Sequence, residues 1–229
     1  MIAQQKGNMV SILHTETMDY WLKFFPALRN FVISPEQLIK KVDNLDWFNS
    51  YYQQFGNDFT KKELNYFIQN ILLTNSILDN IEISEKTIIN IRRGDYYSTE
   101  KKLPSSFDQN AYLNEVIEKF PKIFNYPIEI VSDDVEWCKE NLNFPYHIKS
   151  EDIFFKKDST PIEDFKSLCS ARNLVITNST FSYWGGYICK FLSNKNTVIA
   201  PNFASTLYEN STAYQLHPEW EIIDVLHLC

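Results

Sequence analysis

Hydrophobic and polar residues follow helical spacing in the first part of the chain, which is rich in aromatic residues up to about Asn80. Thr60 followed by Glu63 has the form of a capping box at a helix N-terminus. Apolar residues then recur at helical spacing, at Leu64, Phe67, Ile68, Ile71 and Leu72. The pattern predicts a helix over 61–78, and Pro35 marks the start of a second predicted helix.

From Glu85 onward, short apolar runs alternate with amphipathic segments. The apolar runs predict strands over 87–91, 127–131, 146–149, 173–177 and 197–200. The amphipathic segments predict a helix capped by Asp108 and further helices over 135–142, from Pro161 and over 181–192. Strands that alternate with helices form a parallel sheet through right-handed crossovers. We therefore expect a mainly helical region over 1–84 and an α/β domain with a Rossmann-like parallel sheet over 85–229.

Composition and charge exclude several classes of protein. The 229 residues carry a net charge of −7, which argues against general binding to nucleic acid or anionic membranes. No run of 18 apolar residues exists, and the first ten residues lack the apolar core of a signal peptide, so we expect a cytoplasmic protein without a transmembrane segment. Zinc-type spacing is absent around the cysteines, which we expect to be buried thiols: Cys138, Cys169, Cys189 and Cys229.

Glycine is scarce, with only 5 residues in the chain. Neither the glycine-rich dinucleotide fingerprint nor the P-loop pattern is present, so any nucleotide phosphate must be held by other groups. Ligands of parallel sheets bind where strands end. Three polar segments follow predicted strands and are therefore the candidates for a binding site.

The first segment is Arg92-Arg93-Gly94-Asp95-Tyr96. Adjacent strand residues point to opposite faces, so one arginine would face a crevice while the other is buried against Asp95 or solvated. The guanidinium fork suits phosphate because it donates paired hydrogen bonds and keeps its charge. The alternative is a surface arginine pair with a local aspartate partner.

The second segment is Ser132-Asp133-Asp134. A carboxylate here would accept hydrogen bonds from a ribose hydroxyl or a guanine edge. The alternative is that Ser132 or Asp133 caps the next helix and that Asp134 is favoured by the helix dipole. No D-x-D metal pattern occurs in the chain, and we expect no bound metal.

The third segment, Asn178-Ser179-Thr180-Phe181-Ser182, opens a predicted helix. Hydroxyls and backbone N–H groups at such a terminus either form an anion site or cap a core helix. Gly185 and Gly186 later in the same helix indicate the close approach of another element. Together the three segments outline a crevice for a nucleoside diphosphate.

In order and spacing, the three segments resemble motifs of the α-1,2-fucosyltransferase family, whose members invert the anomeric centre and use GDP-fucose. The family patterns are H-x-R-R-G-D-Y, S-D-D-x-x-W and N-S-T-F-S-W-W-G, and the resemblance covers about 85–201. It implies a two-lobed GT-B fold, no metal or other cofactor, and transfer of fucose to the 2-hydroxyl of a terminal galactoside. The acceptor would belong to a cell-surface glycan such as a bacterial O-antigen or capsule.

The resemblance also implies roles for individual residues. Arg92 would neutralise the β-phosphate of the leaving GDP, and Asp95 would orient the arginines. Asp133 or Asp134 would recognise guanine or ribose. Asp95 and Glu100 are both candidates for the base that takes the acceptor proton. The remaining expected donor contacts are Asn90, which stands where the family has histidine, with Arg93, Asn178, Ser179, Thr180, Phe181 and Ser182.

The family's opening G-G-L-G-N-Q segment has no counterpart here, which predicts a shortened N-terminal lobe. Two alternatives to fucosyl transfer follow. One is a non-catalytic nucleotide-binding homologue that acts as a partner subunit, and the other is a transferase that uses a different nucleotide sugar. The sequence makes no prediction of oligomeric state.

Overall fold

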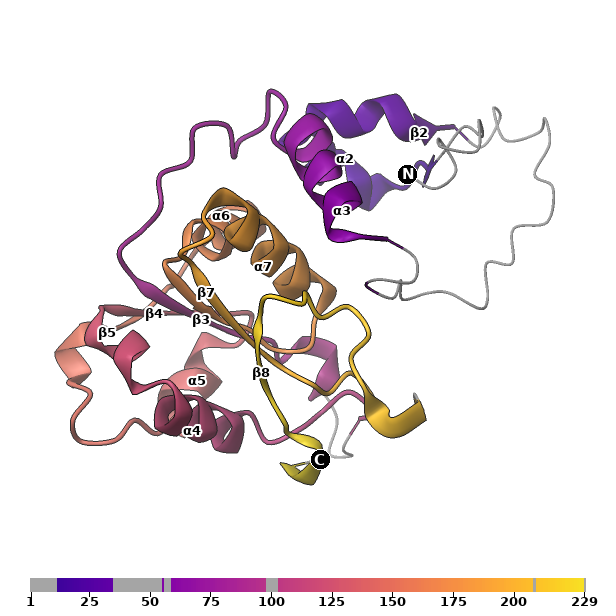
Figure 1. The fold of residues 1–229 in the computed structure, drawn as a ribbon. Helices are drawn as coiled ribbons and strands as arrows, with labels where there is room; N and C mark the ends of the chain where they lie inside the picture. Colours follow the sequence, from indigo (N-terminus) through magenta and orange to yellow (C-terminus); the bar gives the residue numbers. More distant parts are fainter. Residues whose placement is uncertain (1–11, 35–54, 56–58, 98–102, 208, 229) are drawn as a thin grey trace. The chain divides into compact units, whose positions relative to one another are not determined.

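The computed structural model describes residues 12–34, 55, 59–97, 103–207 and 209–228 (Figure 1). The chain divides into two compact units, Met1–Ile81 and Glu82–Cys229.

The first unit contains short elements built around aromatic and aliphatic residues. Strand β1 (Ile12–Leu13) pairs in parallel with β2 (Val32–Ile33). Between them lie α2 (Glu16–Leu22) and the 3-10 helix η1 (Pro26–Phe31). The described part of this unit is therefore mainly helical with a small two-stranded sheet.

Helix α3 (Lys61–Phe67) begins at the predicted capping box. The Thr60 N–H donates to Glu63 Oε2 at 2.8 Å, and the Glu63 N–H donates to Thr60 Oγ1 at 3.3 Å. A π-helical turn, η3 (Ile68–Leu72), continues α3, and the helical segment ends at Leu72. The predicted extension of the helix to residue 78 is therefore wrong. Residues 73–80 form turns instead, in which Asn75 and Asn80 adopt positive φ, a conformation that asparagine tolerates well. The helix predicted from Pro35 lies outside the described residues.

The described part of the second unit contains a six-stranded, wholly parallel sheet in the order β5-β4-β3-β6-β7-β8. The strands are β3 (Thr87–Ile91), β4 (Ile128–Ser132), β5 (Ile153–Phe155), β6 (Asn173–Val175), β7 (Thr197–Pro201) and β8 (Glu221–Ile223). The α/β prediction for this part of the chain is thus confirmed.

Helices cover both faces of this sheet (Figure 1). They are α4 (Gln109–Lys119), α5 (Val135–Asn141), α6 (Pro161–Ser170) and α7 (Thr180–Leu192). Figure 1 shows α4 and α5 on one face and α6 and α7 on the other. Short 3-10 helices complete the unit: η4 (Gly94–Tyr96), η5 (Pro121–Asn125), η6 (Ser150–Asp152), η7 (Glu209–Ser211) and η8 (Leu226–Leu228).

The predicted strand over 146–149 is wrong. Those residues form a turn in which Tyr146 is 99% exposed, and the strand lies later, at β5. Strand β8 was not predicted either. Both are three-residue strands at the edges of the sheet, where Phe154 and Ile222 remain partly exposed, so each gives only a short signal in the sequence.

The two glycines of α7 allow close packing of that helix. A Cβ at Gly185 would lie 2.7 Å from Leu168 Cβ of α6, and one at Gly186 would lie 2.7 Å from the Trp220 ring. The described cysteines are buried thiols, as predicted: Cys138, Cys169 and Cys189. Among the described residues, no helix is both long and apolar enough to cross a membrane.

Candidate functional site

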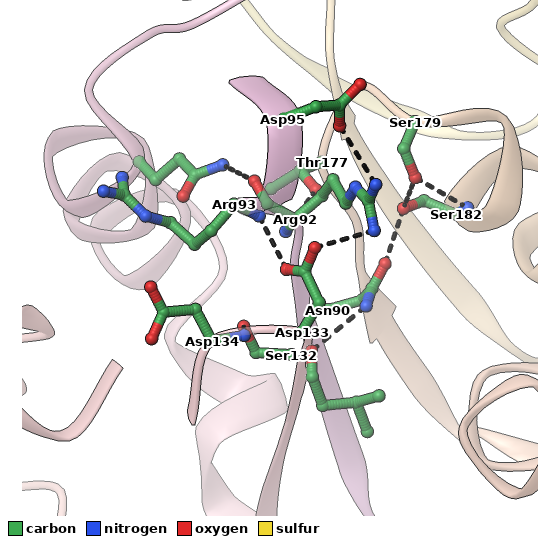
Figure 2. Close-up of polar contacts among 12 residues, drawn as sticks. Asn90, Arg92, Arg93, Asp95, Ser132, Asp133, Asp134, Thr177, Ser179 and Ser182 are labelled. Carbon is green, nitrogen blue, oxygen red and sulfur yellow. Dashed lines mark hydrogen bonds and ion pairs between the residues drawn. The ribbon is translucent and has the colours of Figure 1, made fainter. Parts of the chain in front are cut away.

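The candidate site lies where the strand order reverses. From β3 the chain passes to β4 and β5 on one side, and it returns to β6 on the other side of β3. Crevices form at the carboxyl ends of strands at such a switch point. The three polar segments follow β3, β4 and β6, which are neighbours in the sheet, so the fold brings them together (Figure 2).

Arg92 is held at both its side chain and its main chain. Its Nη1 pairs with Asp133 Oδ2 at 2.7 Å, and its Nη2 pairs with Asp95 Oδ1 at 3.0 Å (Figure 2). Its N–H donates to Thr177 Oγ1 at 3.1 Å, and its carbonyl accepts from Gln109 Nε2 at 2.7 Å. The guanidinium is therefore fixed at the end of β3 while 39% of the side chain stays exposed.

Arg93 points away from Arg92 and takes a different environment (Figure 2). Its guanidinium carbon lies 3.8 Å from the centre of the Tyr97 ring and 3.7 Å from that of Trp137. Both distances are typical of cation–π contacts. Burial lowers the pKa of Arg93, although arginine remains charged at neutral pH. The Arg93 side chain thus links the loop after β3 to α5 through its contact with Trp137. Asp95, which was expected to orient the arginines, pairs with Arg92.

The two aspartates after β4 do different things. Asp133 Oδ1 accepts the Arg93 N–H at 2.8 Å, while its other oxygen pairs with Arg92. Asp134 caps α5, because its Oδ1 accepts the Trp137 N–H at 3.1 Å. The N-cap of α5 is therefore Asp134 and not Ser132 or Asp133, and Asp133 belongs to the arginine cluster.

Gly94 is required by the pair between Arg92 and Asp133. Its φ of +29° is one that side-chain-bearing residues rarely adopt. A Cβ at this position would lie 2.6 Å from Asp133 Oδ2 and 2.9 Å from Arg92 Cζ. The main chain passes this close to the ion pair only because no side chain is present.

Asn90, Ser179 and Ser182 form a buried chain of hydrogen bonds between β3, β4 and α7 (Figure 2). Asn90 Nδ2 donates to the Val131 carbonyl at 3.1 Å, which fixes the orientation of the amide. Asn90 Oδ1 then accepts from Ser182 Oγ at 2.5 Å. Ser182 Oγ lies 2.6 Å from Ser179 Oγ, which also accepts the Ser182 N–H.

The proton count of this network decides what the two serines can do. The Ser182 hydroxyl proton goes to Asn90, so the Ser179 hydroxyl must supply the proton between the two serine oxygens. Both hydroxyl protons are therefore used within the protein. Thr180, by contrast, is the exposed first residue of α7. Its hydroxyl and N–H are the groups of this segment that are best placed for a ligand.

The remaining predicted site residues fall into three cases. Asn178 Nδ2 donates to the carbonyls of Ser105 and Ala204, both at 2.9 Å, so it fastens two loops beside α7. Phe181 packs edge-on against Phe165 of α6. Glu100 lies outside the described residues. Within the described ranges, no group of three or more His, Cys, Asp or Glu side chains is arranged to hold a metal.

A family model described as glycosyl transferase family 11 matches residues 8–224. The chain belongs to this family. An α-1,2-colitosyltransferase from Escherichia coli is 30% identical over 112 residues, which are 48% of this chain and 38% of the relative. Human galactoside α-(1,2)-fucosyltransferase 1 is 30% identical over 120 residues, which are 50% of this chain and 31% of the relative. The aligned part thus covers about a third of each curated relative, and no solved structure matches the chain.

In this family 11 chain, two residues that fix Arg92 were not among the sequence candidates. Gln109 is the first residue of α4 and is 1% exposed, which is unusual for a glutamine. Thr177 is fully buried just after β6. A polar residue at the start of a predicted helix and a threonine at a strand end were the available signals, and neither points to Arg92 without the fold.

Proposed function

We propose that this chain transfers fucose from GDP-fucose to the 2-hydroxyl of a terminal galactoside in a cell-surface glycan, with inversion and without a metal. In this proposal the sheet of the second unit is the nucleotide-binding half of a GT-B enzyme. The observation that carries it is the fixed, half-exposed guanidinium of Arg92 at the switch point of the sheet, beside the N-terminus of α7. Membership of family 11 and the names of the matched relatives support the reaction type.

The donor diphosphate would bind between Arg92 and α7. The guanidinium supplies paired donors, and the helix terminus supplies N–H groups and a positive dipole end. Thr180 would contribute its exposed hydroxyl. Ser179 and Ser182 would contribute by holding the N-terminus of α7 in place, because their hydroxyl protons are already used in hydrogen bonds within the protein.

The chemistry would rely on stabilising the leaving group. As the bond between the sugar and the phosphate breaks, negative charge grows on the departing diphosphate. A fixed cation stabilises that charge more in the transition state than in the ground state. The acceptor hydroxyl must lose its proton to a carboxylate as it attacks, and Asp95 and Glu100 remain the candidates.

Binding and transfer assays test this proposal. The purified chain is titrated with GDP, UDP and GDP-fucose and is then assayed for transfer to lactose and other β-galactosides. We expect selective GDP binding and α-1,2-linked product. Selective UDP binding would contradict the donor assignment, and GDP binding without transfer to any galactoside would instead indicate a nucleotide-binding partner subunit.

The variant Arg92→Ala should abolish transfer while leaving the fold intact. Arg172→Ala is the matched control, since Arg172 is equally exposed (40% against 39%) and pairs with Glu85 at the opposite end of the sheet. We expect near-normal turnover in the control. Near-normal turnover in Arg92→Ala would refute the assignment of Arg92.

A further inference from the structure

The two carboxylates on Arg92 differ in their exposure to water and in their distance from the guanidinium. Asp133 has 28% of its side chain exposed, pairs with Nη1 at 2.7 Å and also accepts the Arg93 N–H. Asp95 has 73% exposed and pairs with Nη2 at 3.0 Å. An ion pair so exposed to water is weak, because solvent screens the charges and competes for the hydrogen bond. The pair between Asp95 and Arg92 is therefore the weaker of the two.

A diphosphate that pairs with Arg92 competes with the carboxylates already on its guanidinium. Each terminal nitrogen carries one of them, Asp133 on Nη1 and Asp95 on Nη2. Arg93 does not take the place of Arg92 here, because its guanidinium lies against the Tyr97 and Trp137 rings.

We propose that the donor diphosphate replaces Asp95 at Nη2 of Arg92 while Asp133 stays on Nη1. This inference rests on the proposed role of Arg92 in binding the donor. A phosphate oxygen is a stronger partner for a guanidinium than an exposed carboxylate, and Asp133 keeps the fork in the plane that presents Nη2 to it. Asp133 is then a positioning residue, and Asp95 no longer pairs with Arg92 once the donor is bound.

The exchange is tested by measuring GDP affinity in variants that keep the side-chain shape. Asp95→Asn removes the competing charge, so we expect GDP to bind about two- to fivefold more tightly, as loss of an exposed ion pair implies. Glu136→Gln is the matched control, because the Glu136 side chain is also 73% exposed but pairs with Lys139 and Lys157. Its GDP affinity should stay at the wild-type value.

Asp133→Asn should act in the opposite direction. Without the charge that holds Nη1, Arg92 loses its orientation, and we expect GDP to bind at least tenfold more weakly in a chain whose melting curve shows that it is folded. The inference is overturned if Asp95→Asn binds GDP no more tightly than the wild type, if Glu136→Gln tightens binding equally, or if Asp133→Asn also tightens it.

Failure of the proposed function is read separately, from the wild-type chain alone. If the wild type prefers UDP, the donor assignment fails, and the same variant comparison is made with UDP, so the exchange itself is still tested. A wild-type chain that binds neither nucleoside diphosphate overturns both proposals.

Discussion

Replacing Gly94 by alanine tests whether the contact between Arg92 and Asp133 governs the site. The new Cβ would lie 2.6 Å from Asp133 Oδ2, so that oxygen must retreat by about 0.8 Å to reach ordinary contact at 3.4 Å. A displacement on the order of 1 Å at a reacting group costs roughly 100-fold in rate. We expect kcat/KM for GDP-fucose to fall by about 100-fold.

The effect of Gly94→Ala on stability should be smaller. The positive φ costs an alanine about 1–2 kcal/mol, which corresponds to a fall in melting temperature of roughly 2–8 °C. Gly185→Ala is the contrasting control, because its Cβ would lie 2.7 Å from Leu168 Cβ, away from the arginine cluster. That variant should melt at a lower temperature but keep its kcat/KM per folded molecule. If Gly94→Ala kept both GDP affinity and kcat/KM within about twofold of wild type, the reasoning would be refuted.

Two further predictions concern buried groups. Ser182→Ala removes the hydrogen bond to Asn90 and should lower the free energy of unfolding by about 1–3 kcal/mol in urea titrations, with GDP affinity nearly unchanged. Lost GDP affinity at unchanged stability would instead show that the hydroxyl binds phosphate directly. Burial raises the pKa of Cys138 to about 11 and that of Cys189 to about 12. In a Cys229→Ser background, neither of these two thiols should therefore react with Ellman's reagent at pH 8 until the chain is unfolded. Because the unfolded thiols ionise near pH 9, the free energy of unfolding should fall as pH rises from 9 to 11. Rapid labelling of the native protein at pH 8 would contradict the assignment of Cys138 and Cys189 as buried thiols.

The parts of the fold that the sequence predicts well are those with strong local signals. The Thr60 and Asp108 caps are present, since each depends on residues within one helical turn. Strand β3 is fully buried and was predicted at its observed bounds. Edge strand β5 was missed, because Phe154 faces solvent and only three residues pair. The end of α3 was placed too late, because asparagines that favour turns interrupt an otherwise helical pattern.

For the site, the sequence identifies the segments but not the partners within them. The order of the strands at a switch point brings the three segments together, and that follows from the alternating pattern. That Asp133 pairs with Arg92 does not follow, because Asp133 comes after a different strand, and Asp133 and Asp134 are equally plausible partners by residue type. Thr177 lies 85 residues from Arg92, so its hydrogen bond to the Arg92 N–H is set by sheet pairing alone.

The chain of hydrogen bonds through Asn90 has a consequence for how this site can evolve. Its amide must donate to β4 and accept from α7 at once, so a residue that replaces it must satisfy both neighbours or leave a buried polar group unpaired. Histidine, which the family pattern has at this position, also presents one donor and one acceptor when it is neutral, and the same pattern keeps both serines. Position 90 should therefore accept only residues that both donate and accept, because an apolar residue there would leave the Val131 carbonyl and the Ser182 hydroxyl without these partners.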